Sequence, residues 1–165
     1  MGRAGDQELE ALFHAHFAPL VRGLALAAGS YEAADDAVQD AFVQLHRHWR
    51  KVSAYEEPVA WLQRVATNRV ANQRRGAQRQ ANLVERLAES IDAADEVDRA
   101  AKLDLLAAIA DLPERQRLVV GLHHLTGLKV AEVAAALGIS EGTVKSQLHD
   151  ARSNLRSALE VDDHA

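Results

Sequence analysis

The sequence predicts an all-α protein made of two small helical domains joined by a linker, and three observations support this fold class. Apolar residues recur at helical spacing through most of the 165 residues. No segment of any length alternates between apolar and polar residues, as a half-buried strand does. Alanine is abundant and aromatic residues make up only 4% of the chain, a composition that favours helices. We expect the first domain over residues 1–80, the linker over 81–100 and the second domain over 101–160.

Three helices are expected in the first domain. The first covers residues 6–28, and Ser30 is a suitable N-cap for the second. A loop over residues 51–57 leads to a third helix, which begins at Pro58 and runs to about residue 75. Apolar residues of the second helix follow a spacing of i, i+4, i+7 and i+11 and form a buried stripe of Val38, Phe42, Leu45 and Trp49.

The second domain is expected to end in a helix-turn-helix over residues 129–156. A break at Leu112-Pro113 and a helix over 114–125 precede it. Gly138 is placed where a helix ends in a left-handed residue, Ile139 can fill the corner between the two helices, and Ser140 is a preferred N-cap.

The last helix separates an apolar face from a polar face. One narrow stripe contains Val144, Leu148, Ala151, Leu155 and Leu159. A different sector contains Lys145, His149, Arg152 and Arg156. A recognition helix divides its surface in this way, because one side packs while the other enters the major groove. An ordinary helical hairpin with solvated charges shows the same pattern, so this segment alone leaves both interpretations open.

Charge is unevenly distributed along the chain. The net charge of −5 argues against a protein that binds DNA on its own. Residues 32–40 contain four acidic and no basic residues. Residues 58–81 contain no acidic residue and five arginines: Arg64, Arg69, Arg74, Arg75 and Arg79. Basic islands in an acidic protein are suited to DNA binding when a partner delivers the protein.

The basic third helix also carries groups suited to contact with bases. Asn68 and Asn72 lie one turn apart and can hydrogen-bond exposed base edges or the backbone. Tyr55, in the loop before this helix, is suited either to stacking on a flipped base or to anchoring the loop. We expect Trp49 and Trp61 to pack in the core.

Neither metal binding nor catalysis is expected. The histidine pairs His14/His16, His46/His48 and His123/His124 are one or two residues apart, so their side chains should diverge, whereas ligand pairs on one helix face are three or four apart. No phosphate-binding glycine loop, nucleophile elbow or catalytic triad signature is present. We expect no cofactor, no small-molecule substrate and no enzymatic activity.

The composition also places the protein in a compartment. The chain has no cysteine and therefore no disulfide or thiolate ligand. The N-terminus lacks the apolar core of a signal peptide, and no run of about 18 apolar residues is present. We expect a cytoplasmic protein without direct membrane insertion.

Several segments resemble those of the sigma-70 superfamily. Three of them resemble its C-terminal domain: Asp-Leu-Pro-Glu-Arg-Gln-Arg-Leu-Val-Val from residue 111, Leu-Thr-Gly-Leu-Lys-Val-Ala-Glu-Val-Ala from residue 125, and Gly-Ile-Ser-Glu-Gly-Thr-Val-Lys from residue 138. Residues 35–49 resemble the polymerase-binding helix of domain two, and residues 60–75 resemble the helix that opens the promoter −10 element. Two such domains and one linker resemble an extracytoplasmic-function (group IV) sigma factor.

This resemblance implies that the protein binds core RNA polymerase and directs it to promoter DNA, held in check by an anti-sigma factor. The polymerase-binding residues it implies are Asp35, Asp36, Gln39 and Asp40. Domain two would melt the −10 element with Tyr55, Arg64, Asn68, Arg69, Asn72, Arg74 and Arg75. Domain four would read the −35 element with Ser140, Glu141, Thr143, Lys145, Ser146, His149, Arg152 and Arg156.

Some features leave alternatives open. His123-His124 and Asp150 depart from the residues that are common at these positions of the family, which puts the contacts there in doubt. Asp92, Asp95, Glu96 and Asp98 in the linker are suited either to a basic channel that nascent RNA later uses or to a merely soluble tether. The rival functions are a stand-alone helix-turn-helix regulator and a sigma-like adaptor that does not recognise promoters.

Overall fold

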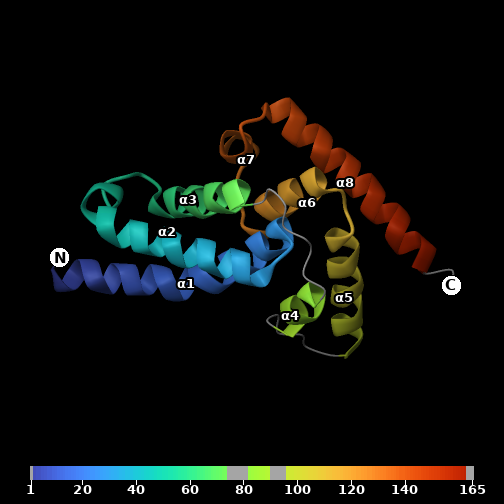
Figure 1. Ribbon diagram of the computed structural model, residues 1–165, viewed down its shortest axis with the longest axis horizontal. Helices are drawn as coiled ribbons and strands as arrows, with labels where there is room; N and C mark the ends of the chain where they lie inside the picture. The colour runs from blue at the N-terminus through green and yellow to red at the C-terminus, as the bar shows by residue number, and fades with distance from the viewer. Residues whose placement is uncertain (1, 74–81, 90–95, 163–165) are drawn as a thin grey trace.

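The computed structural model describes residues 2–73, 82–89 and 96–162, and within these ranges every regular element is a helix. The all-α fold class is therefore confirmed. In Figure 1, the helices of the N-terminal half lie side by side: α1 (Arg3–Ala28), α2 (Tyr31–Val52) and α3 (Pro58–Gln73). The C-terminal half surrounds their inner end with α4 (Leu83–Glu89), α5 (Glu96–Ala110), α6 (Glu114–Val120), the π-helix η1 (Gly121–Leu125), α7 (Val130–Leu137) and α8 (Glu141–Asp162).

The junction between α1 and α2 forms as the sequence predicts. α1 ends at Ala28, and Gly29 continues the chain in the left-handed conformation while its N–H donates to the Ala25 carbonyl at 2.8 Å. Ser30 then caps α2, because its hydroxyl accepts from the Ala33 N–H at 3.2 Å. α1 begins at Arg3, three residues before the predicted start.

The N-terminal core is built around the predicted stripe of α2. Val38 and Leu45 are fully buried and Trp49 is nearly so. α2 also runs to Val52, beyond the predicted start of the loop, because the Val52 side chain is buried and continues the same apolar face. Burial of a valine or leucine side chain contributes roughly 1.5–3 kcal/mol each, so this stripe fixes how α2 lies against α1 and α3.

The segment predicted as a linker is in part docked on the N-terminal half. α4 contacts α1, α2 and α5 and buries Leu83 and Leu87. The guanidinium of Arg86 lies 4.4 Å from the centre of the Tyr31 ring and forms an ion pair with Glu32. Residues 83–89 of the predicted linker therefore form a docked helix. α5 begins at Glu96, inside the range expected to be linker.

In the C-terminal half, the helix predicted over residues 114–125 forms with an unexpected ending. α5 ends at Ala110 and α6 begins after Pro113, as expected for a proline break. The last five residues widen into η1, where the Thr126 N–H donates to the Gly121 carbonyl at 3.1 Å. Such single π turns re-aim the side chains that follow them.

The two halves share one continuous apolar core. α1 contacts α6 and η1, and α3 contacts α7. The buried cluster runs from Leu24 and Ala28 of α1 to Val119 and Leu122 of the C-terminal half. The sequence left the placement of the two domains open, and the structure shows them packed together.

α1 is also long and apolar enough to cross a membrane by length and composition alone. From Leu20 to its end, most of its residues are buried among the other helices, which is the arrangement of a core helix.

Candidate nucleic-acid interface

The face of α8 that packs is separate from the face that carries the predicted DNA contacts. Val144, Leu148 and Ala151 are buried against the rest of the C-terminal half. Leu155 and Leu159 are only half-buried, because α8 extends beyond the helices beneath it. The predicted contact residues are exposed except for the half-buried Thr143: Ser140, Glu141, Lys145, Ser146, His149, Arg152 and Arg156. The exposed set carries a net positive charge suited to a polyanion.

The turn before α8 has the predicted geometry. Gly138 ends α7 with φ 65°, a conformation in which a residue with a Cβ atom is strained, and its N–H donates to the Ala134 carbonyl. Ile139 packs against the core at the corner. The Ser140 hydroxyl accepts from the Thr143 N–H at 3.1 Å and lies 2.9 Å from the Thr143 hydroxyl. Ser140 therefore sets the start of the helix that carries the other candidate residues.

The two histidines before this motif lie closer together than expected. We expected their side chains to diverge, but the His123 and His124 rings meet edge to face with centres 4.7 Å apart, so that expectation is wrong here. The cause is local, because both residues lie in the widened η1 turn. Burial, the adjacent His123 and then Arg152 lower the pKa of His124 below its usual value. His123 Nδ1 lies 2.7 Å from the Leu128 carbonyl oxygen.

Within the described ranges, no three or more histidine, aspartate or glutamate residues come together as a metal site would need.

The third helix places its polar residues on one accessible face. Leu62, Ala66 and Val70 of α3 are buried, whereas its predicted contact residues Arg64, Asn68, Arg69 and Asn72 are exposed. Tyr55 is 39% exposed in the loop before α3. Arg74, Arg75 and Arg79 lie outside the described residues, as do Asp92 and Asp95. Asp98 is exposed, and its carboxylate lies 3.7 Å from the Lys102 ammonium.

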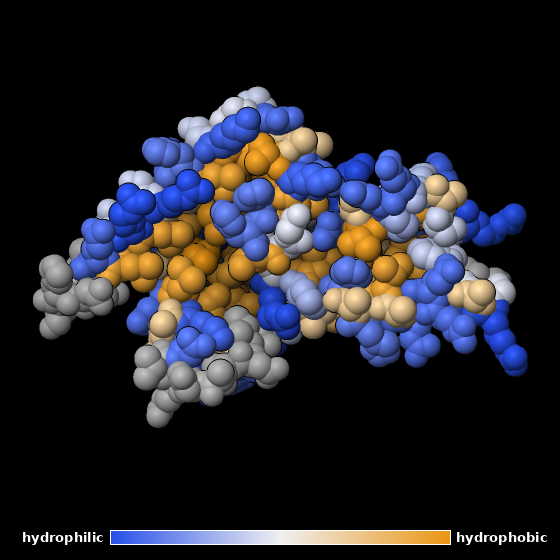
Figure 2. Space-filling view, turned by 180° about the vertical axis from the view of Figure 1, so that it is seen from behind, coloured by the Kyte–Doolittle hydropathy of each residue, from blue (hydrophilic) through white to orange (hydrophobic). Residues whose placement is uncertain are grey.

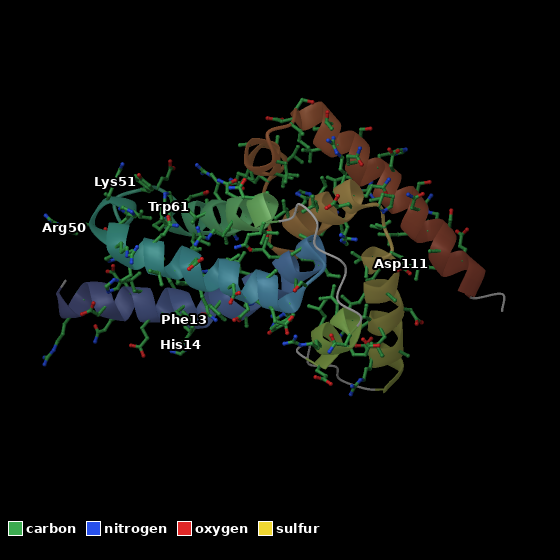
Figure 3. All side chains as sticks on the ribbon, in the orientation of Figure 1. Phe13, His14, Arg50, Lys51, Trp61 and Asp111 are labelled. Carbon is green, nitrogen blue, oxygen red and sulfur yellow. The ribbon has the colours of Figure 1, made fainter. Side chains whose placement is uncertain are left out.

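Trp61 is only partly in the core. Its ring packs edge to face on His48, with centres 6.4 Å apart, while Trp49 is buried as predicted. Figure 3 shows Trp61 near the end of α2, where Arg50 and Lys51 project outward beside the loop that leads to α3.

An ion pair joins the two predicted sites on the N-terminal half. The Nε of Arg69 on α3 donates to Asp40 Oδ2 on α2 at 2.9 Å, and the Nη2 of the same guanidinium contacts that oxygen too. Gln39 donates to Asp35 one turn earlier. Asp40 and Arg69 are 29 residues apart in the chain, and no local pattern in the sequence predicts that they pair. A predicted polymerase-binding acid is thus paired with a predicted DNA-binding arginine.

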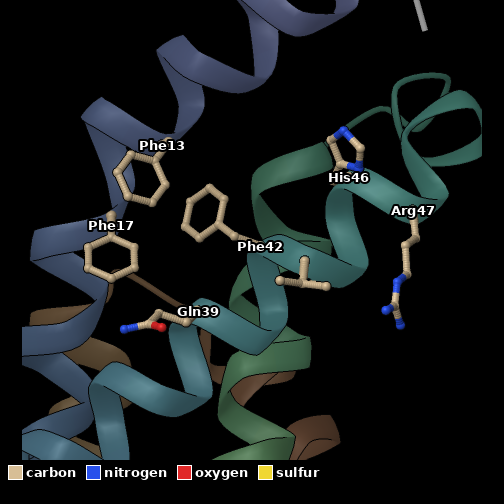
Figure 4. Close-up of a pocket in the computed structure, with 7 residues that line it drawn as sticks. Phe13, Phe17, Gln39, Phe42, His46 and Arg47 are labelled. Carbon is tan, nitrogen blue, oxygen red and sulfur yellow. The ribbon is translucent and has the colours of Figure 1, made fainter.

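Sequence reasoning missed an apolar groove beside the acidic residues. Phe13 and Phe17 of α1 and Phe42 of α2 cluster there, with ring centres 4.6 Å apart for the first pair and 5.2 Å for Phe13 and Phe42. Figure 4 shows these rings with Gln39, His46 and Arg47 around a hollow of about 590 Å³. We expected Phe42 in a buried stripe, but it is only half-buried, and Phe13 beside it is 41% exposed.

A signal for this groove was present in the sequence. These three residues are all the phenylalanines in the chain. The histidines at positions 14 and 16 mark this part of α1 as a surface rather than a core.

A second hollow separates α5 from α8. Figure 2 shows hydrophobic side chains gathered where the arm formed by α8 leaves the rest of the molecule. The lining of this hollow combines apolar and polar groups, among them Ala107, Asp111, Leu112 and Asn154.

Two family models and several curated proteins match this chain. Residues 13–80 match the family Sigma-70 region 2, and residues 102–155 match the family Sigma-70, region 4. The ECF RNA polymerase sigma factor SigL of Mycobacterium tuberculosis is 35% identical over 158 residues, which cover 92% of this chain and 89% of that protein. The RNA polymerase sigma-E factor of Streptomyces coelicolor is 37% identical over 129 residues, covering 76% and 71% of the two chains.

A solved structure has a similar fold. The sigma factor RpoE of Bartonella quintana, in complex with the anti-sigma factor NepR, superposes with a TM-score of 0.59 at 24% identity. The match covers 95% of this chain and 98% of that one.

Proposed function

Because the chain belongs to the extracytoplasmic-function sigma factors of the sigma-70 family, we propose that it binds core RNA polymerase in the cytoplasm and directs it to promoters. It supplies recognition and has no catalytic chemistry of its own. The observation that carries the proposal is the division of α8, which buries Val144, Leu148 and Ala151 and exposes a basic sector. We assign this sector to the −35 element.

The exposed face of α3 is assigned to the −10 element. Asn68 and Asn72 present amide groups that both donate and accept hydrogen bonds, as unpaired base edges require. Arg64 and Arg69 supply positive charge for the strand backbone, and Tyr55 is accessible for stacking on a base. Salt-dependent phosphate contacts would position the strand, while the amides and the ring would meet its bases.

The polymerase-binding surface is assigned to α2 and extends into the apolar groove. Asp35, Asp36, Gln39 and Asp40 form its acidic part, and Gln39 also lines the hollow between Phe13, Phe17 and Phe42. A partner helix with apolar residues on one face and basic residues at its edge would fit both parts. Burial of the exposed aromatic area would give affinity, and the acids would fix the orientation of the partner.

An anti-sigma factor is the proposed inhibitor. The Bartonella quintana sigma factor with the similar fold is held in a complex with such a protein. An inhibitor that covers the α2 surface would exclude polymerase by direct competition.

Run-off transcription with purified core polymerase tests the proposal. We expect transcripts of defined length only when both proteins are present, on templates selected by the reconstituted holoenzyme. Sequence-specific binding by the isolated protein, without any effect on polymerase, would favour a stand-alone regulator. Polymerase binding without promoter-specific transcripts would favour an adaptor.

Two sets of variants locate the surfaces. Asp36→Arg and Phe13→Ser should each lower polymerase affinity at least about tenfold, a loss of about 1.4 kcal/mol. Glu85→Arg makes the same charge change on the exposed face of α4 and should bind polymerase normally. Arg152→Ala should leave polymerase binding intact and weaken promoter binding, and relaxed sequence preference would identify a base contact rather than a phosphate contact.

A further inference from the structure

The ion pair between Asp40 and Arg69 lies on a different side of α2 from the apolar groove. α2 and α3 lie side by side in Figure 1, and the guanidinium of Arg69 reaches from α3 to the carboxylate of Asp40. Residues two apart on a helix point about 200° apart, so Asp40 and Phe42 face different sides of α2. Of the described residues, Phe42 and Gln39 line the groove and Asp40 does not. The contact of Asp40 with α3 is therefore separate from the groove.

This ion pair uses a fork of N–H groups that also suits a phosphate. The Nε of Arg69 donates to Asp40 Oδ2 at 2.9 Å, and Nη2 contacts the same oxygen. Arginine binds carboxylates and phosphates with the same fork, because both ligands present anionic oxygens to it. Two neighbouring donors that meet a carboxylate oxygen are not available to a phosphate at the same time. On Arg69, the carboxylate of Asp40 therefore occupies the place that a DNA phosphate would take.

Arg69 lies among the groups assigned to the −10 element. Asn68 directly precedes it, and Asn72 follows three residues later, on the same side of α3 as Arg69. Both partners of the ion pair are accessible, with 44% of the Arg69 side chain and 46% of the Asp40 side chain exposed. A DNA strand can thus reach the pair, and neither charge has to cross a buried region when partners are exchanged.

We propose that Asp40 is a positioning residue of the −10 site: its carboxylate holds Arg69 in the free protein, and the promoter strand takes the guanidinium by displacing it. This inference rests on the proposed assignment of α3 to the −10 element. Exposed ion pairs are weak, so the competition lowers the affinity for the strand by up to about fivefold, which corresponds to about 1 kcal/mol. A strand that makes no contacts through its bases must still displace Asp40, so the pair restrains sequence-independent binding at Arg69.

A double-mutant cycle on the isolated full chain tests this competition. Asp40→Asn removes the competing charge and keeps the size of the side chain. We expect about three- to fivefold tighter binding of a single-stranded −10 oligonucleotide, taken from a template that the holoenzyme selects. In the Arg69→Ala background, the same substitution should change the affinity less than about twofold, because only the screened effect of one charge remains. Equal effects in the two backgrounds overturn the proposal.

NMR titration at low salt measures these affinities even when binding is weak, and it also reports the displacement itself. The Nε–H signal of Arg69 should begin at different positions in the parent chain and in Asp40→Asn, and the two signals should converge as the oligonucleotide saturates. A signal that stays at its free position in the parent chain, while the backbone amides of Asn68 and Asn72 respond to the DNA, overturns the proposal.

Two further variants serve as controls. Asp40→Glu keeps the carboxylate and should bind the oligonucleotide as the parent chain does; binding as tight as that of Asp40→Asn contradicts the competition. Glu32→Gln removes an acid of the first turn of α2 that is paired with Arg86 of α4, and should change the affinity less than about twofold. Where the parent chain needs polymerase to bind this DNA, the same cycle on the holoenzyme is the test. If the parent chain does not bind it even with polymerase, the proposed function is what fails.

Discussion

At the scale of single residues, the pairing of Asp40 with Arg69 connects two surfaces with different assignments. Both side chains are close to half exposed, so the ion pair contributes at most about 1 kcal/mol to stability. Either residue can therefore exchange its partner for a polymerase side chain or a DNA phosphate at little cost. The pair holds the Arg69 guanidinium against α2 until a stronger anion is available.

Replacement of Arg69 should weaken the contact with the melted strand. For Arg69→Ala we expect weaker binding of single-stranded −10 DNA by the holoenzyme, with the slope of log affinity against log salt reduced by about 0.7, because one phosphate contact is lost. Binding titrations at several salt concentrations measure this slope. Arg3→Ala removes an exposed arginine from the far end of α1 and serves as control. An unchanged slope would remove Arg69 from the interface.

His124 should make stability depend on pH. Its pKa is lowered in the folded protein, so between that value and the unfolded value the unfolded chain binds more protons. The stability gained from neutral His124 is therefore present above the unfolded pKa and is lost as pH falls toward the folded pKa. Urea unfolding at pH 7.5 and pH 5.5 should show a smaller loss for His124→Gln than for the parent chain. An equal loss in both proteins would rule His124 out as its source.

At the scale of elements, α8 depends on its first turn. Ser140 accepts from the Thr143 N–H and is also a predicted DNA contact, so a simple deletion confounds the two roles. Ser140→Ala should lower the free energy of unfolding by about 1 kcal/mol, because the cap is lost. Ser140→Asp should retain that stability while its negative charge weakens DNA binding. Denaturant unfolding and promoter-binding titrations separate the effects, and equal stability of all three proteins would show that the cap is unimportant.

The helices themselves were largely predictable. Local rules account for the end of α1 at Gly29 and for the start of α2 after Ser30. They also account for the proline break before α6 and for the turn at Gly138. Those rules concern neighbouring residues, which the sequence states directly. η1 was not predictable, because a π turn keeps the composition of a helix and differs only in which carbonyl each N–H reaches.

At the scale of the whole molecule, the shared core should make the two halves unfold together. We expect one calorimetric transition for the parent chain, with equal calorimetric and van't Hoff enthalpies. Gly23→Ala should divide it into two transitions, because a Cβ atom at Gly23 of α1 would lie 2.4 Å from Thr126 Cγ2 of the other half and would force the halves apart. Gly142→Ala adds the same methyl group to α8, where its nearest neighbour is Ser140 Oγ at 3.8 Å, and should retain a single transition. Two separate transitions in the parent chain would show that the junction does not couple the halves.

The sequence by itself determined the all-α class, the order and most of the bounds of the helices, the family, and the two faces of α8. These properties are written in periodicity and in short-range motifs, so they need no knowledge of distant contacts. Only the tertiary structure decided that α4 docks on α1 and α2 and that Asp40 pairs with Arg69. It also decided that three phenylalanines line one groove and that Gly23 of α1 packs closely against Gly121 of η1. Each of these depends on residues far apart in the chain, whose meeting is set by how the helices pack and not by the pattern within any one of them.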